Sequence, residues 1–262
     1  MKFGVQTFTV RKKQKKSITA ALKPLIDIGI RSFEIARIDF NERNAAELAA
    51  LVKSEGIEIS SIQVKPKYVY GEPERIIGFC RTVGCPIVVI SMLPFKCILG
   101  TEKDFYGFVD TLDAMAELYG KSGITLAYHH HNWEYIRLSS GRTRMAELIC
   151  RTKRIRFVHD TYWTAGCGVD PVRQIEEFGE RLVGIHLRDL GFTAKGISVV
   201  PTDTAIGDGV IDFGRVLSAA EKVGCSYYAI EQKTKNPYPE LEKSFGRLEA
   251  IKAELSGRGE IL

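Results

Sequence analysis

Short apolar runs alternate with segments of helical spacing along the whole 262-residue chain. Residues 86–90 (PIVVI) are almost wholly apolar, as expected of a strand that is covered by helices on both faces. Residues 45–55 instead place Leu48, Leu51 and Val52 on one helix face, and Gly56 follows as a stop signal. The pattern predicts strands over residues 3–5, 32–35, 57–64, 86–90, 124–129, 155–160, 182–186 and 227–231. It predicts helices over residues 18–28, 45–55, 72–83, 104–120, 142–150, 171–178, 213–223 and 239–255.

Eight strands alternating with eight helices predict an α/β protein that forms a single (β/α)₈ TIM barrel, a fold that needs about 250 residues. A doubly wound sheet is the main competitor, but it usually has a glycine-rich turn after an early strand, and residues 6–11 (QTFTVR) contain no glycine. We expect one domain over residues 1–255 and a loose tail over residues 256–262. The longest irregular stretch, residues 189–212, is a candidate lid because it follows the seventh strand at the active face.

The chain has 37 basic and 32 acidic residues, a formal net charge of +5. We interpret the basic clusters at residues 11–16 and 151–154 as solvated surface, with attraction to phosphorylated ligands or nucleic acid as the alternative. Six cysteines without a CxxC pair indicate reduced thiols. Because no leader-like or long apolar segment is seen, we expect a cytoplasmic protein that does not enter membranes.

All five histidines lie between residues 129 and 186, at or just after the ends of expected strands. In a TIM barrel the carboxyl ends of the strands meet at one face, where active sites are built. Side chains alternate along a strand, so His129 and His131 should share one face while His130 points away. His159 alternates with Asp160 in the same way. We therefore expect His130 and His159 to be structural.

Asp160, His186 and Glu231 end the strands that follow. Asp160 either binds a cation or caps the next segment. A glutamate after the apolar run YYAI is costly to bury unless it is paired or metal-bound, so Glu231 is a candidate ligand or general base. Arg188 could hold an anionic or enolate oxygen, with an ion pair to Asp189 as the alternative. Imidazole and carboxylate together suit Zn, Mn, Fe or Co.

The first three strands supply weaker candidates for the same barrel mouth, namely Gln6, Glu34, Gln63 and Lys65. Each has an alternative role as a surface or helix-capping residue. Residues 206–212 (IGDGVID) form a tight loop that we expect to close over the site, although the glycines alone would also fit simple turns.

Five segments resemble, in order, the sugar phosphate isomerase/epimerase group of the xylose-isomerase-like barrel superfamily. They are residues 4–11 (GVQTFTVR), 128–135 (YHHHNWEY), 160–163 (DTYW), 186–189 (HLRD) and 207–212 (GDGVID). Each segment is weak alone, but the ordered set covers essentially the whole domain. The resemblance implies one divalent metal ion, Mn, Co, Mg or Zn, held by residues from strands five to eight.

Carried over residue by residue, the resemblance implies three metal ligands, Asp160, His186 and Glu231. The superfamily usually supplies a glutamate at the end of strand five, where this chain has His129. Either His129 or His131 takes that position, or Glu134, which aligns with the family's glutamate, curls back to supply the carboxylate. Arg188 stands where lysine is usual.

The activity that the resemblance implies is isomerisation or epimerisation of a keto-sugar or sugar derivative in cytoplasmic carbohydrate metabolism. In this hypothesis the metal stabilises an enediolate after a proton is removed next to the carbonyl. Glu231 and Glu134 are the candidate acid and base, and Arg188 is the third candidate catalytic residue. The expected substrate-binding residues are Gln6, Glu34, Lys65, His131, Trp163 and Arg188, with Trp133 beside Trp163 on the sugar's apolar face.

Three alternatives stay open. A lyase or dehydratase of the inosose or keto-glycoside type begins with the same proton abstraction. A non-catalytic sugar-binding barrel would lack the metal. The three-zinc DNA-repair endonucleases of this fold need more ligands than five histidines readily provide, so we expect a small-molecule sugar or polyol as partner and no nucleic acid. Association of barrels through their helices would give a homo-oligomer.

Overall fold

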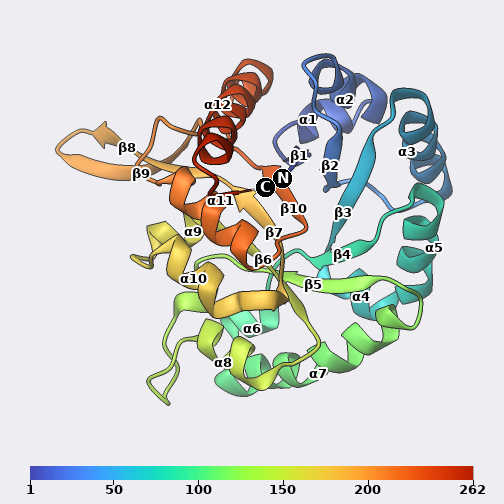
Figure 1. Cartoon of the computed structure of the whole chain (residues 1–262). Helices are drawn as coiled ribbons and strands as arrows, with labels where there is room; N and C mark the ends of the chain where they lie inside the picture. The colour runs from blue at the N-terminus through green and yellow to red at the C-terminus, as the bar shows by residue number, and fades with distance from the viewer. Residues whose placement is uncertain (262) are drawn as a thin grey trace.

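The computed structural model describes residues 1–261, and eight of its strands form a closed parallel barrel in the order β1-β10-β7-β6-β5-β4-β3-β2. The barrel strands are β1 (Phe3–Gln6), β2 (Ser32–Ile35), β3 (Glu58–Val64), β4 (Ile87–Ile90), β5 (Thr125–His129), β6 (Arg156–Asp160), β7 (Leu182–Leu187) and β10 (Tyr227–Ile230). The predicted bounds differ from these by at most one residue. The predicted (β/α)₈ barrel is confirmed, with helices outside the strands (Figure 1).

Each predicted helix is present, with ends shifted by up to three residues. These helices are α2 (Ile18–Asp27), α3 (Glu42–Glu55), α5 (Pro73–Val83), α7 (Glu102–Gly120), α8 (Arg144–Arg151), α10 (Pro171–Phe178), α11 (Phe213–Lys222) and α12 (Pro237–Gly257). The Ser17 side chain caps α2 by accepting a hydrogen bond from the Ala20 amide. Gly56 ends α3 in the left-handed conformation, at φ +61°.

Short helical segments in the loops were not predicted, because three to six residues are too few to show a period. They are α1 (Arg11–Gln14), α4 (Pro66–Gly71), α6 (Phe95–Leu99), α9 (Thr161–Gly166) and the 3₁₀ turns η1 (Trp133–Tyr135) and η2 (Gly179–Arg181).

The two-residue period of the strands divides the core into an inner and an outer part. Inside the barrel, alternate residues of β4, β5, β6 and β10 form one buried cluster of Ile87, Val89, Ala127, Val158, Tyr227 and Ala229. The residues between them pack outward against the helices. The same alternation carries inward-facing positions to the carboxyl ends of the strands, where polar side chains replace the apolar ones.

Tyr227 fills the barrel where a small partner makes room for it. A Cβ on Gly184 of β7 would lie 2.2 Å from the Tyr227 ring, so position 184 admits only glycine while the tyrosine stays. The Tyr227 hydroxyl donates to Glu34 at 2.6 Å. The Tyr227 ring therefore closes the barrel interior directly beneath the polar side chains at the carboxyl ends of the strands.

Residues 189–212 are not the irregular lid that the sequence predicted. Strands β8 (Asp189–Lys195) and β9 (Ser198–Thr204) pair as an antiparallel hairpin that projects from the barrel (Figure 1). The hairpin turns at Gly196, whose φ of +63° suits a glycine. Among the described residues, the loop 206–212 does not line the cavity at the carboxyl ends of the strands, so the prediction that it closes over the site is wrong.

The buried carboxylate of Asp189 holds the loop 206–212 instead. It accepts hydrogen bonds from the amides of Gly207, Gly209 and Ile211 at 2.8 to 3.2 Å. A Cβ on Gly209 would lie 2.2 Å from the same carboxylate, so glycine is needed for this approach. The loop is fixed by its backbone rather than free to move over the barrel.

We expect Asp189→Ala to lower the free energy of unfolding by ~1–3 kcal/mol, because three amides lose their buried acceptor. Urea unfolding followed by circular dichroism measures the change. Asp208→Ala is the matched control in the same loop: it removes exposed ion pairs with Lys243 and Arg247 and should cost less than about 1 kcal/mol. Equal losses in the two variants would contradict the anchoring role of Asp189.

The C-terminal residues differ from the predicted tail over 256–262. Helix α12 continues to Gly257, and the Ile261 side chain is buried against the core. Position 262 of that predicted tail lies outside the described residues. Within residues 1–261, no helix combines the length and apolarity that a membrane span requires.

Candidate active site

Four inward-facing residues at the carboxyl ends of β5, β6, β7 and β10 form a compact group: His129, Asp160, His186 and Glu231. One potential ligand atom from each lies within 4.8 Å of the others, and all four side chains are buried. Ligands about 2.1 Å from a common ion lie at most about 4.2 Å apart, so the four atoms need only a small movement to hold a single divalent metal. The barrel brings together the predicted ligands from all four strands.

The hydrogen bond between His129 and Ser91 directs the lone pair of the other ring nitrogen of His129 toward this group. Its Nδ1 lies 3.3 Å from the carbonyl oxygen of Ser91, which can only accept, so Nδ1 carries the hydrogen. Nε2 then faces Asp160 Oδ2 at 3.4 Å. A nitrogen lone pair and a carboxylate oxygen that face each other leave a place for a cation between them.

His186 is oriented from below by Glu34 of β2. Its Nε2 lies 2.7 Å from Glu34 Oε1, and Nδ1 points at Glu231 Oε2 from 3.1 Å without hydrogen-bond geometry. Burial lowers the pKa of His186, but the Glu34 and Glu231 carboxylates outweigh it and raise that pKa to about 10. A proton and a metal ion would therefore compete for Nδ1 of His186. Because this buried nitrogen has no hydrogen-bond partner among the described residues, it is suited to bind a metal.

The two carboxylate oxygens of Asp160 have different roles, one in capping a helix and one in the site. Oδ1 accepts from the Trp163 amide and so caps α9, while Oδ2 faces the ligand group and Arg188 Nη1 at 3.0 Å. Burial opposes ionisation, but Arg188 and the neighbouring imidazoles hold the pKa of Asp160 well below its usual value. Arg188 and His186 likewise lower the pKa of Glu231 to about 2 against the effect of burial. Both carboxylates are ionised at neutral pH.

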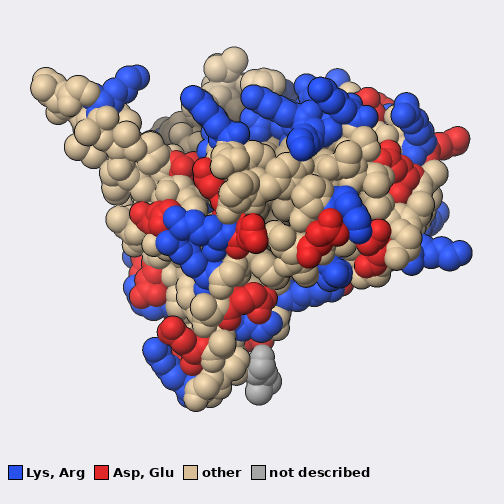
Figure 2. All heavy atoms as spheres, turned by 90° about the horizontal axis from the view of Figure 1, so that it is seen from above, with Lys and Arg blue, Asp and Glu red and all other residues tan. Residues whose placement is uncertain are grey.

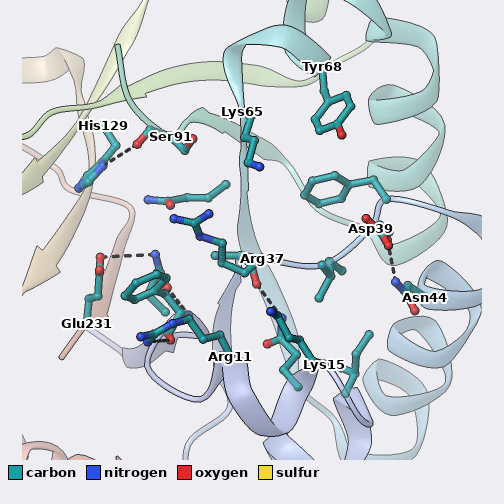
Figure 3. A pocket seen from close by; sticks show the side chains of 18 of the residues that line it. Arg11, Lys15, Arg37, Asp39, Asn44, Lys65, Tyr68, Ser91, His129 and Glu231 are labelled. Atoms are coloured by element: carbon teal, nitrogen blue, oxygen red, sulfur yellow. Dashed lines mark hydrogen bonds between the residues drawn. The ribbon is translucent and has the colours of Figure 1, made fainter. Parts of the chain in front are cut away.

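A cavity of about 990 Å³ opens above the group, and His129 and Glu231 form part of its wall (Figure 3). Five residues predicted to contact substrate also line it, namely Gln6, Lys65, His131, Trp163 and Arg188, together with the weaker candidate Gln63. Burial lowers the pKa of His131 to about 3, so its ring is neutral. The expected substrate-binding residues therefore meet the ligand group at one cavity, with the exceptions described below.

A family model for the xylose isomerase-like TIM barrel matches residues 22–253. The chain belongs to this family. An inosose dehydratase of Glaesserella parasuis is 22% identical, over 74% of this chain and 76% of that protein. An inosose dehydratase of Geobacillus thermodenitrificans is 24% identical over 52% of this chain, and the match spans only 49% of that relative. The crystal structure of a sugar phosphate isomerase/epimerase from Parabacteroides distasonis has a TM-score of 0.77 at 20% identity, covering 95% of this chain and 93% of that one.

Glu134, predicted as a ligand and catalytic residue of this xylose isomerase-like barrel, does not join the ligand group or line the cavity. Its carboxylate accepts from the Tyr128 hydroxyl and, at 2.8 Å, from the His131 amide. Tyr128 alternates with His129 and packs outward against Phe108, so Glu134 is drawn to the outer side of β5. Burial raises the pKa of Glu134. Its position supports the turn after β5 rather than the metal centre.

Glu34 and Trp133 also differ from their predicted roles. Glu34 is fully buried and does not line the cavity; besides His186 it binds Ser61 and Tyr227, so the prediction of substrate contact is wrong. Trp133 lies in η1, is 39% exposed and is likewise absent from the cavity wall. Glu34 instead orients a candidate ligand.

His130 and His159 pack away from the ligand group, as strand alternation predicts. His130 Nε2 lies 3.3 Å from His159 Nδ1 and accepts from the Asp160 amide at 3.1 Å. Both rings contact Phe178 of α10. Burial lowers the pKa of His159 to about 3, so this pair is neutral and structural.

Asp203 of β9 was missed by the sequence interpretation. Its Oδ2 accepts from Arg188 Nε at 3.1 Å and also from Nη2, so the hairpin base fixes the guanidinium that faces Asp160. The predicted alternative, an ion pair between Arg188 and Asp189, does not form, since Asp189 holds the loop amides. Recognition of a hairpin around Gly196 was the sequence signal that could have placed Asp203 beside β7.

Proposed function

We propose that this barrel is a divalent-metal-dependent enzyme that removes a proton next to the carbonyl of a keto-sugar or cyclic polyol, as an isomerase or epimerase. The observation that supports the proposal best is the buried group of His129, Asp160, His186 and Glu231 beside an open cavity. Mn, Co, Mg and Zn all accept carboxylate or imidazole donors. When bound, such an ion supplies Lewis-acid polarisation of a carbonyl oxygen.

Glu231 is the candidate proton acceptor, because it is ionised and its side chain reaches the cavity wall. Gln6 lies 3.4 Å from Glu231 Oε2 and restrains it. Arg188 and Lys65 would hold substrate oxygens. Trp163 offers an aromatic face to the apolar side of a sugar ring and excludes water.

A dehydratase is the second candidate, and the position of Glu134 favours it over an epimerase. With Glu134 turned away, Glu231 is the one carboxylate of the ligand group that lines the cavity among the described residues. A single base can move a proton between adjacent carbons or remove it as a hydroxyl leaves, whereas inversion at one carbon needs proton delivery from the opposite face. The inosose dehydratase relatives support the same alternative.

A screen of keto-sugars, keto-glycosides and inososes in deuterated water, with Mn²⁺, Co²⁺ or Mg²⁺ added, tests the proposal. Proton NMR should show metal-dependent loss of the signal next to the carbonyl, and a chelator should abolish that loss. An isomeric product identifies an isomerase or epimerase, and an unsaturated product identifies a dehydratase. A protein without bound metal that holds a sugar tightly and exchanges no proton would be a binding barrel, contrary to the proposal.

A further inference from the structure

The outer part of the cavity is strongly basic. Eight Lys and Arg residues line it, against three acidic ones: Arg11, Lys15, Lys16, Arg37, Arg43, Lys65, Arg188 and Lys233, with Asp39, Glu47 and Glu231. Figure 2 shows Lys and Arg side chains gathered along one edge of the molecule. Among the described residues, Arg188 is the one cation of this set with a carboxylate within 4.0 Å. The other seven cations have no ion-pair partner within residues 1–261.

Arg11 and Arg37 are held together by one aromatic ring. The guanidinium carbon of Arg11 lies 3.8 Å from the Phe8 ring centre, and that of Arg37 lies 5.3 Å from it. Arg11 also donates to the Phe8 carbonyl at 2.8 Å. The backbone of Arg37 has a φ of +61°, an unfavourable conformation for a residue other than glycine. From this position in the β2–α3 loop, its long cationic side chain extends toward the cavity. The positive charges of Arg11 and Arg37 therefore lie side by side at the Phe8 ring.

The pair of arginines is connected to the metal centre along β1. The Gln6 amide nitrogen lies 3.4 Å from Glu231 Oε2, and its oxygen accepts from the Phe8 amide. Glu231, Phe8 and both arginines line the same cavity (Figure 3). A ligand that reaches Glu231 at one end can therefore reach Arg11 and Arg37 at the other.

Neutral donors without partners line the same cavity. The side-chain nitrogens of Gln63 and Trp163 are buried and have no acceptor among residues 1–261. Buried donors without acceptors are costly, so they indicate acceptors that arrive with a ligand. Glu47, one of the nearby acids, does not meet this need, since its carboxylate accepts from the Thr19 amide and hydroxyl.

We propose that Arg11 and Arg37, with Lys15 and Lys65 beside them, form a subsite for an anionic substituent, a phosphate or a carboxylate, on the sugar or polyol. This inference rests on the proposed function for its sugar scaffold. Arginine forks match the planar or tetrahedral oxygens of both groups, and the uncompensated positive charge is neutralised when either one binds. The metal centre and the subsite would then fix the two ends of the substrate.

Isothermal titration of the metal-loaded protein with D-fructose and D-fructose 6-phosphate tests the subsite. We expect the phosphate ester to bind about tenfold or more tightly, inorganic phosphate to compete, and the preference to fall at higher salt. Arg37→Gln and Arg11→Gln should each reduce the preference. A ketose with a terminal carboxylate distinguishes the two sources, because the tighter ligand identifies the natural anion.

Lys53→Gln, which removes an exposed cation from α3 away from the cavity, is the matched control and should keep the preference. Equal affinity for the neutral and charged ketoses would overturn the subsite. So would a preference that survives both arginine variants, or one that Lys53→Gln reduces equally. Deuterium exchange in the screen above tests the proposed function independently of the subsite. If the protein prefers the anionic ketose but exchanges no deuterium, only the proposed function is contradicted. If it exchanges deuterium but shows no preference for the anion, only the subsite is contradicted.

Discussion

Glu231→Gln should lower the rate of metal-dependent deuterium incorporation by about 10²–10⁴-fold, the usual contribution of a positioned base. Glutamine keeps the shape of the side chain but cannot accept the proton. NMR exchange with the best substrate of the screen measures the effect. Saturating metal must be used, because the same substitution also removes a candidate ligand.

Glu242→Gln on α12 removes an exposed carboxylate far from the cavity and serves as the control for this substitution. It should leave the exchange rate unchanged. If Glu231→Gln, saturated with metal, exchanged deuterium as fast as this control, another group would have to be the base.

Glu34→Gln should weaken metal binding by about 10–100-fold, the usual effect of removing a carboxylate behind a ligating histidine. Glutamine can still accept from His186 Nε2, so the ring keeps its orientation but loses the negative charge that makes Nδ1 a better donor to the metal. Titration of the metal-free protein with Mn²⁺ or Co²⁺ measures the affinity without reference to any substrate.

Ser61→Ala is the matched control for Glu34, because it removes one neutral donor, 2.6 Å from Glu34 Oε2, and leaves the carboxylate in place. Its effect on metal affinity should be several times smaller. Unchanged affinity in Glu34→Gln would show that Glu34 supports the barrel core alone.

The strand period was enough to bring together the four residues of the candidate metal-binding group. His129, Asp160, His186 and Glu231 each end an apolar run, and each follows its inward-facing neighbour by two residues. Closure of the barrel then brings four such positions together whatever lies between them in the sequence. For the same reason His159, one residue before Asp160, could be predicted to face outward.

Predictions failed where a side chain's direction depends on a loop or on a contact across the barrel. Glu134 lies beyond the end of β5, where no period applies, and Tyr128 draws it outward. Glu34 lies within β2, one residue before its end, but its partner His186 comes from β7, 152 residues later, and no local pattern indicates that meeting. The β8–β9 hairpin was missed because its strands pair only with each other and not with the barrel.

The closure of the barrel has a consequence for how the chain folds. Strand β1 pairs with β10, as in Phe3 with Tyr228, so the first strand lacks one of its two neighbours until almost the whole polypeptide has been synthesised. Contacts of such sequence separation are slow to form, and until then β1 and β7 present open edges to other chains. The last residue of the candidate metal-binding group, Glu231, follows this final strand, so that group is complete only when the ring of strands has closed. Metal capture would then report the last step of folding during synthesis.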